Sequence, residues 1–414
     1  MVLEFDGLAE TVRVEGARIL ATLIRTVGDV QIAEDAVSEA TLAALKAWPV
    51  TGPPPEPRAW LTVTARRKAI DIIRRERDRA GKERDGLLMM ELSRSDLPAD
   101  GVVHDDQLRL IFICCHPTLS PATRVALALR TLCGLSPAQI AGVLLTTEAA
   151  TKRSLTRARH KIAAANIPYR VPTEPELAER LPAVCGVIQS LYTAGHAPLD
   201  SADLYDIDSC TEAIRLAELL HLLLPDQLMP TAVLSLLLLT EARRPARLDA
   251  AGVVVTLDRQ DRSLWDGGAI ERGIGLLNDS LLRSQRQADA YQLQAAIAAE
   301  HARATSYEST DWSEILRLYE LLLTLAPNEA ASLGRAVAAA EAFSPASGLA
   351  LMDDLPRTPR WHAVRAELLA RDGRYSEAVG ALDEALTGPS TRAEREFRTR
   401  QRAELLGMCR SDSR

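Results

Sequence analysis

The chain has 414 residues, enough for two to four domains, and 47% of them are hydrophobic while 25% are charged. This balance is typical of a soluble globular protein and excludes a disordered chain. Aromatic residues make up only 4%, and alanine and leucine are abundant, so we expect an all-α fold. Because the net charge is −7, any contact with nucleic acid must come from a local cluster of cations.

No targeting or membrane segment is expected. The first residues, Met1 to Asp6, are acidic and lack the apolar core of a signal peptide. Six scattered cysteines are then expected to be reduced thiols of a cytoplasmic protein. The most apolar stretch, residues 216–239, is interrupted by Pro225, Asp226 and Pro230, too often to span a membrane. We expect a buried helical hairpin there.

The first well-marked helix is predicted from Asp29 to Trp48. Apolar residues recur on a helical period along it, and the other face is acidic, with Glu34, Asp35 and Glu39. Such a face either keeps a helix soluble or docks onto a basic partner.

A proline-rich loop and a basic helix follow. Residues 49–57 contain five prolines and a glycine, which predicts a loop. From Arg58 to Arg84 the sequence is helical in pattern and carries ten lysines and arginines against four acids, a local charge of +6. That concentration favours contact with phosphates, and the alternative is a solvated helix. Residues 84–106 then lose all periodicity and predict a linker.

Residues 107–166 have the signals of a helix-turn-helix. Ser120 followed by Pro121 predicts a capped helix start, and Gly134 predicts its end. Ser136 and Gln139 are spaced as a capping box, and Thr147 can cap the next helix.

The last of these helices has a narrow apolar stripe and a cationic remainder. The stripe consists of Thr151, Leu155, Ala158 and Ile162. Five cations stand against the single acid Glu148; they are Lys152, Arg153, Arg157, Arg159 and Lys161. This arrangement suits a helix that enters the major groove of DNA, and the alternative is a solvated helix in an ordinary bundle.

Several segments together resemble bacterial RNA polymerase sigma factors of the extracytoplasmic-function class. They are, in order, the acidic run 33–40, the proline-rich loop, the run 58–71 that begins Arg-Ala-Trp-Leu-Thr, the linker, and the helix-turn-helix that ends Leu-Thr-Arg-Ala-Arg at Arg159. The resemblance covers roughly residues 8–165. The runs 258–266, 291–297 and 310–312 and the Cys114-Cys115-His116-Pro117 run are similar to the subgroup with a long tetratricopeptide-like C-terminal extension.

The resemblance implies a division of labour between the segments. Glu34, Asp35 and Glu39 would contact core RNA polymerase on the β′ clamp helices, and the second DNA-binding domain would meet the β flap. The −10 element of the promoter would be bound by the basic helix, through Trp60, Arg66, Arg67, Lys68, Arg74 and Arg75. The −35 element would be bound by the last helix of the helix-turn-helix, through Thr147, Lys152, Arg153, Arg157 and Arg159.

The sequence departs from the class at three places. Arg67 stands where the class often has an asparagine, and Arg153-Ser154 reverses the usual serine-then-arginine order. Thr193-Ala194-Gly195-His196 replaces an Asn-Glu-Gly-Tyr-like run in the extension.

From residue 172 onward the sequence has only helical signals. The spacing of Trp312, Ile315, Tyr319 and Leu322 recurs in a second segment that starts at Tyr375 after a Gly-Arg turn, and a weaker unit is expected between 328 and 355. Arrays of helical hairpins leave a concave surface for a protein or peptide partner, and the alternative is a purely structural cap. The expected domains are therefore 1–83, the linker 84–106, 107–166 and 172–414.

Two groups of residues have side chains that could form a functional site. Asp258, Asp261, Arg262, Trp265 and Asp266 are expected to form either a buried ion-pair network or a latch between domains of the regulatory extension. Cys114 and Cys115 lack the spacing of a zinc site and are expected to be buried helix residues, with a redox-sensitive pair as the alternative. With no catalytic triad and no nucleotide-binding glycine pattern, we expect neither enzymatic activity nor a cofactor or metal.

Two other functions remain open at this point. A free-standing helix-turn-helix regulator would bind duplex DNA without polymerase, and it would not need the acidic helix or the basic helix. A helical-repeat scaffold with an accessory DNA-binding module would depend on the partner held by residues 172–414. The sequence gives neither the promoter motif nor the activating signal, nor whether the extension inhibits or is required.

Overall fold

The computed structural model describes residues 3–80, 106, 109–132, 135–144, 146–164, 174–197, 204–285, 287–388 and 390–412. Helices dominate these residues, and the described part of the chain holds one isolated β-bridge, between Leu248 and Val254, and no strand. This confirms the all-α prediction. The chain divides into two compact units, an N-terminal unit Met1–Leu191 and a C-terminal unit Tyr192–Arg414. The predicted linker lies almost entirely outside the described residues.

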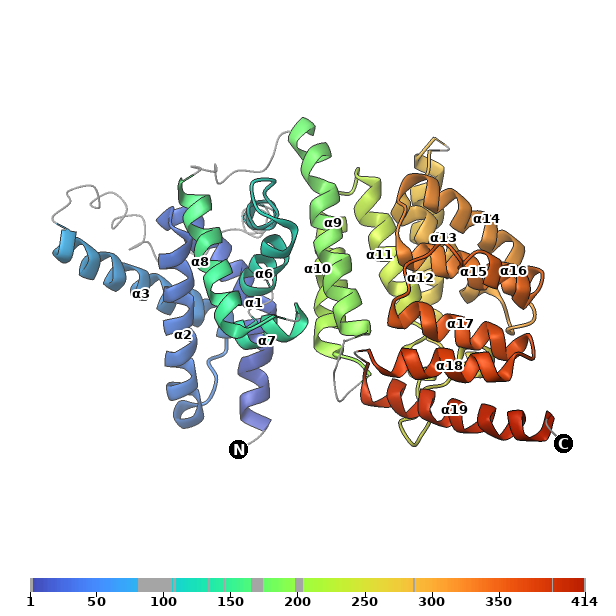
Figure 1. Cartoon of the computed structure of the whole chain (residues 1–414). Coiled ribbons are helices and arrows are strands. Elements are labelled where there is room, and N and C mark those ends of the chain that lie inside the picture. The colour runs from blue at the N-terminus through green and yellow to red at the C-terminus, as the bar shows by residue number, and fades with distance from the viewer. Residues whose placement is uncertain are drawn as a thin grey trace. The chain divides into compact units, whose positions relative to one another are not determined.

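The N-terminal unit begins with three helices that pack on one another (Figure 1). Their bounds are α1 Leu3–Val27, α2 Val30–Thr51 and α3 Pro57–Ala80. Asp29 starts α2 as predicted, because its carboxylate accepts the N–H groups of Gln31 at 2.7 Å and Ile32 at 3.1 Å. Three alanines of α2 are completely buried, which lets the helices approach closely; they are Ala33, Ala36 and Ala44.

The proline-rich loop is shorter than predicted. Pro49 lies inside α2, which continues to Thr51 and ends at Gly52 with a φ of +77°. The prediction that the loop starts at Pro49 was wrong because a proline has helical φ and, so near a helix end, costs little more than one backbone hydrogen bond. The loop ends as expected at Pro57, the first residue of α3.

The rest of the N-terminal unit contains a helical turn at residues 109–114 and the helices of the predicted helix-turn-helix. These are α6 Pro121–Thr131, α7 Pro137–Val143 and α8 Glu148–Ala164, and both α6 and α7 pack on α8. The next helix, α9 Glu174–His196, runs through the division between the two units.

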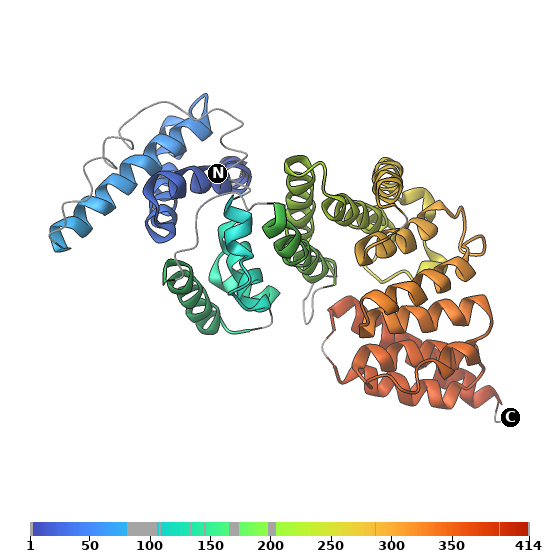
Figure 2. The same cartoon turned by 90° about the horizontal axis from the view of Figure 1, so that it is seen from above.

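The C-terminal unit is a series of helices in which each packs on its neighbours in the chain (Figures 1 and 2). Its helices are α10 Ile207–Leu223, α11 Leu228–Glu241, α12 Gly267–Arg283, α13 Ala290–Arg303, α14 Trp312–Leu325, α15 Glu329–Ala342, α16 Pro345–Ala350, α17 Pro359–Arg371, α18 Tyr375–Leu386 and α19 Arg392–Asp412. The pair α10 and α11 is the predicted apolar hairpin. None of the described helices is long and apolar enough to cross a membrane.

The predicted repeat segments correspond to α14 and α18, and the weaker unit corresponds to α15 and α16. Close packing between α14 and α15 depends on Gly334, because a Cβ there would lie 2.4 Å from the Tyr319 ring. Gly373, with a φ of +78°, makes the predicted turn before α18.

Candidate nucleic-acid interface

The local sequence determines where the helices of the helix-turn-helix begin. The Ser120 hydroxyl accepts the Thr123 N–H at 3.4 Å, and Pro121 is the first residue of α6. The Thr147 hydroxyl accepts the Ala150 N–H at 3.2 Å and caps α8. Both predicted caps are therefore confirmed, whereas the side chain of Gln139 and residue Gly134 lie outside the described residues.

One stripe of α8 is buried, and it is the predicted one. Thr151, Leu155 and Ala158 are at most 3% exposed, and Ile162 is 9% exposed. These side chains fix the rotation of the helix, because they pack toward α6 and α7. The cations therefore lie on its remaining faces.

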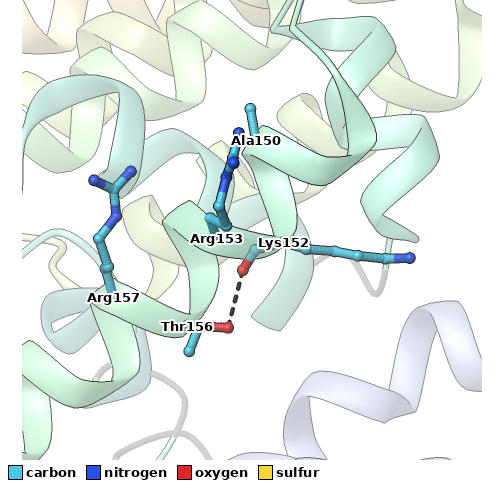
Figure 3. Close-up of a pocket in the computed structure, with 5 residues that line it drawn as sticks. All are labelled: Ala150, Lys152, Arg153, Thr156 and Arg157. Carbon is cyan, nitrogen blue, oxygen red and sulfur yellow. Dashed lines mark hydrogen bonds between the residues drawn. The ribbon is translucent and has the colours of Figure 1, made fainter.

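The cations of α8 fall into two groups. Lys152, Arg153 and Arg157 are exposed, and Figure 3 shows the two arginines extending in similar directions while Lys152 points elsewhere. Lys152 forms an ion pair with Glu148 at 2.6 Å, and its carbonyl accepts the Thr156 hydroxyl at 3.0 Å. Within the described part of the chain, Arg153 and Arg157 have no hydrogen-bond or ion-pair partner, so they can meet a ligand without breaking a contact.

The second group already contacts the protein. The Arg159 guanidinium pairs with Glu34 of α2, and the Lys161 ammonium donates to the Thr118 carbonyl. Glu34 is only 7% exposed and also accepts the Thr131 hydroxyl at 3.3 Å. Burial raises the pKa of Glu34, and the nearby Arg159 and Arg130 oppose this only in part. Two side chains predicted to contact different partners thus bind each other.

The other acids of α2 face outward or toward α3. Asp35 is exposed and accepts the Gln31 side-chain amide at 3.0 Å. Glu39 pairs with Lys68 at 3.3 Å and with Arg75 at 3.4 Å, and both cations belong to α3. The predicted polymerase contact Glu39 and two predicted −10 contacts therefore form one surface network.

The remaining predicted −10 residues lie along α3. Arg67 and Arg74 are exposed, whereas Arg66 is partly buried. The Trp60 ring meets Trp48 of α2 edge to face, with ring centroids 5.6 Å apart. Trp60 therefore holds the start of α3 against α2 and leaves part of its ring accessible.

The 258–266 motif lies in the C-terminal unit and is not a buried ion-pair network. Its acids are exposed: Asp258 pairs weakly with Arg259 at 3.9 Å, and Asp266 caps α12 by accepting the Ala269 N–H at 3.0 Å. Asp261 accepts the Ser263 hydroxyl at 2.7 Å and the Ser263 N–H at 2.9 Å, and these two hydrogen bonds lower the pKa of Asp261.

Arg262 and Trp265 anchor this motif inside the C-terminal unit. Arg262 donates to the carbonyls of His301 at 2.6 Å and Ala304 at 2.7 Å. Its guanidinium also lies over the buried Trp265 ring, 4.7 Å from the centroid. The motif therefore ties the segment before α12 to the end of α13.

Sequence reasoning missed the role of one acid. Asp106 is completely buried and accepts from Arg25 of α1 and from Arg109, both at 2.9 Å. No periodicity marks this residue, and only its place at the predicted start of an apolar run could have suggested it. Cys114 and Cys115 are buried as predicted, and burial raises the pKa of both thiols, that of Cys115 to about 12. Burial therefore favours the protonated thiol over the thiolate at both positions.

Three protein families match segments of this chain. The family described as sigma-70 region 2 matches residues 12–79, and sigma-70, region 4 matches residues 109–162. A family of unknown function (DUF6596) matches residues 180–281. The uncharacterized protein R00370 of Rhizobium meliloti (strain 1021) is 40% identical over 375 residues, which span 89% of this chain and 88% of that protein. No solved structure matches the chain.

A second relative carries a functional name. The probable ECF RNA polymerase sigma factor SigI of Mycobacterium tuberculosis, in strains CDC 1551 / Oshkosh and ATCC 25618 / H37Rv, is 35% identical over 164 residues. The match spans 38% of this chain and 55% of SigI. The chain belongs to the extracytoplasmic-function sigma factors. This sigma factor carries regions 2 and 4 followed by a helical C-terminal extension, and its role is that of an RNA polymerase sigma factor. Core RNA polymerase and promoter DNA are its partners, and sigma-factor families are non-enzymatic initiation factors.

Proposed function

We propose that α8 recognises the −35 element as duplex DNA, with Arg153 and Arg157 as its leading contacts. The observation that supports this most directly is that both arginines are exposed on the second helix of a helix-turn-helix and are unpaired within the described residues. An arginine in the major groove can bind a guanine edge or a phosphate, and either use requires a free guanidinium. Thr147 and Lys152 stand at the N-terminal end of α8, where base contacts are usually made. Arg159 can contact the −35 element only when its ion pair with Glu34 is broken.

The −10 element is assigned to α3. Melted DNA needs a cationic surface that follows the backbone and an aromatic or pocket site for extruded bases. Along α3, Arg67 and Arg74 are exposed, Lys68 and Arg75 pair with Glu39, and Arg66 and Trp60 are partly exposed. These six residues supply both requirements on one helix.

Contact with core polymerase is assigned to α2. Asp35 is exposed, and Glu39 stands one turn further along the same helix, so both can meet the basic side of the β′ clamp helices. Glu34 is buried against Arg159 and is the weakest candidate of the three. The helix-turn-helix domain would meet the β flap, and the linker 84–106 would follow the polymerase near its RNA exit path.

The C-terminal extension, taken as 172–414, is assigned a regulatory or assisting role. Its helical repeats offer a surface for a protein or peptide partner. Residues 1–83 and 107–166 would form the two promoter-binding domains. The whole protein is proposed to work in the cytoplasm, where the polymerase is found.

Binding to core polymerase tests the α2 assignment. Asp35→Ala combined with Glu39→Ala should weaken binding to the purified core enzyme about tenfold, because charged contacts control association at such interfaces. The variant should leave the circular dichroism spectrum unchanged, since Asp35 and Glu39 are not core residues. Asp353→Ala with Asp354→Ala, two exposed acids before α17, is the matched control. Equal binding by both double variants would remove the assignment.

A further inference from the structure

Three arginines of the C-terminal unit gather between the end of α11 and the start of α12. The guanidinium carbons of Arg243 and Arg262 lie 5.2 Å and 4.7 Å from the centroid of the Trp265 ring. The guanidinium of Arg247 lies over the Tyr205 ring at 4.8 Å. Aromatic faces support guanidinium groups in this way and hold them in defined orientations.

These arginines are not neutralised by acids. No ion pair joins Arg243, Arg247 or Arg262 to a carboxylate within the described ranges, whereas arginines elsewhere in this unit do pair, as Arg374 does with Glu377 at 2.7 Å. Two acids act on this region: the Glu241 carboxylate is already engaged by Arg244 and by the Tyr192 hydroxyl at 3.0 Å, and the exposed Glu308 interacts electrostatically with Arg262. A net positive charge therefore remains.

The same cluster contains four buried polar atoms that have no hydrogen-bond partner among the described residues. They are Arg243 Nε, Tyr205 OH, Trp265 Nε1 and His301 Nδ1. Buried polar groups are normally satisfied, so an isolated exception means little. Three of them, Arg243 Nε, Tyr205 OH and Trp265 Nε1, carry a proton to donate, and three unused donors around one group of arginines suit a ligand with acceptor oxygens.

The electrostatic field of the cluster also bears on the charge of that ligand. Burial, followed by Arg247, Arg243 and Arg244, lowers the pKa of His196 to about 3, and burial with Arg243 and Arg262 does the same to His301. Burial and the neighbouring Arg247 and Arg262 lower the pKa of Arg243 itself to about 10. Burial is the largest cause of each shift and disfavours charge of either sign, but the arginine charges add to it in the same direction, so the local field is positive and favours an anion over a cation.

This argument also weighs against a metal ion in the same region. The potential ligand atoms of His196, Cys210 and Glu241 lie within 4.8 Å of one another, which is close enough for all three to bind one metal ion. Arg247 already contacts the His196 ring and Arg244 pairs with Glu241, so arginines engage two of these three candidate ligands. The arginines around His196 would repel a cation.

We propose that Arg243 and Arg247, with Tyr205, bind an oxyanion, the phosphate or carboxylate group of a small ligand of the extension, while Arg262, whose guanidinium donates to His301, Ala304 and Thr310, adds its positive charge. Guanidinium forks match the geometry of both groups, and the phenol adds a donor. The proposal uses only residues of the C-terminal unit, so it does not depend on the assignments of α2, α3 and α8. Such a ligand gives the extension a means to respond to the chemical state of the cell.

Calorimetric titration of the full chain tests the proposal, with inorganic phosphate and succinate as separate probes in chloride buffer. We expect saturable binding of at least one probe at one site per chain. Arg243→Met should weaken that binding at least tenfold, because a charge-assisted contact is lost. Arg400→Met, which removes an exposed arginine of α19, is the matched control and should bind as the wild type does.

A second variant guards against misfolding. Tyr205→Phe removes a hydroxyl that has no partner among the described residues, so it should not destabilise the protein but should weaken the anion several-fold. Binding of phosphate alone would indicate a phosphorylated ligand, and binding of succinate alone a carboxylate ligand. Failure of both probes to bind, or binding that neither Arg243→Met nor Tyr205→Phe weakens, would overturn the proposal.

Discussion

Arg157 is the side chain on which the −35 assignment can be tested with least disturbance. It is exposed and unpaired among the described residues, so Arg157→Ala should fold normally. We expect its affinity for −35 duplex DNA to fall about tenfold, as for loss of one base or phosphate contact. Fluorescence anisotropy with labelled duplexes at several salt concentrations measures this.

The same experiment separates two uses of Arg157. A phosphate contact predicts equal weakening on all sequences and a salt dependence that is lower by about one unit of slope, whereas a base contact predicts lost discrimination. Arg400→Ala on α19 is the control with an equal change of charge. If the two variants bind −35 DNA equally well, Arg157 is not a DNA contact.

The burial of Glu34 makes stability depend on pH. Burial raises the pKa of Glu34 in the folded chain above its unfolded value, so the folded state holds the proton more tightly. This contribution is present below the unfolded pKa and is lost as pH rises through the folded pKa. Compared with Glu34→Gln, the wild type should therefore gain stability as the pH falls from about 7 to about 4. Urea unfolding at each pH measures the difference, and a gain on raising the pH would contradict it.

Among the elements, the 258–266 segment depends on Trp265, which is 7% exposed and lies against two guanidinium groups. Trp265→Ala should reduce the free energy of unfolding of the C-terminal unit by about 3 kcal/mol, as for other large buried aromatic residues. Leu264→Ala, beside it but 53% exposed, should cost less than about 0.5 kcal/mol. Urea denaturation followed by circular dichroism compares the two, and similar losses would contradict the anchoring role.

Helix positions were predictable where the signal is local. Ser120, Thr147 and the four-residue stripe of α8 fixed α6 and α8 because capping and periodicity act within one or two turns. The end of α2 was missed because a proline near a helix end breaks fewer contacts than its usual role suggests.

Partners distant in the sequence were not predictable. In the sequence, Glu34 looks like one of several acids on a solvated helix face. Only the folded structure brings it into contact with Arg159, which lies 125 residues further along the chain. The same holds for Arg243, which has no ion pair among the described residues, because sequence cannot say which arginines lack an acid nearby. The predicted contact residues themselves remain predictions until binding is measured.

For the whole molecule, the distribution of charge explains how an acidic chain can bind DNA. The total charge is −7, yet α3 and α8 each carry several exposed cations. Local fields act over about 10 Å at moderate salt, so the total charge does not prevent either helix from meeting phosphates. The helical extension adds a second, separately folded part whose cationic cluster is directed at a different ligand.

The most direct test of the account is transcription by purified core RNA polymerase from a promoter library, with the full chain as the only sigma factor. We predict that the chain associates stably with core and that transcripts start from promoters sharing −35 and −10 elements. Arg157→Ala should reduce or redistribute these starts, while Arg400→Ala should leave them unchanged. A chain that fails to bind core, or binds it without producing promoter-specific transcripts, would contradict the proposed promoter recognition.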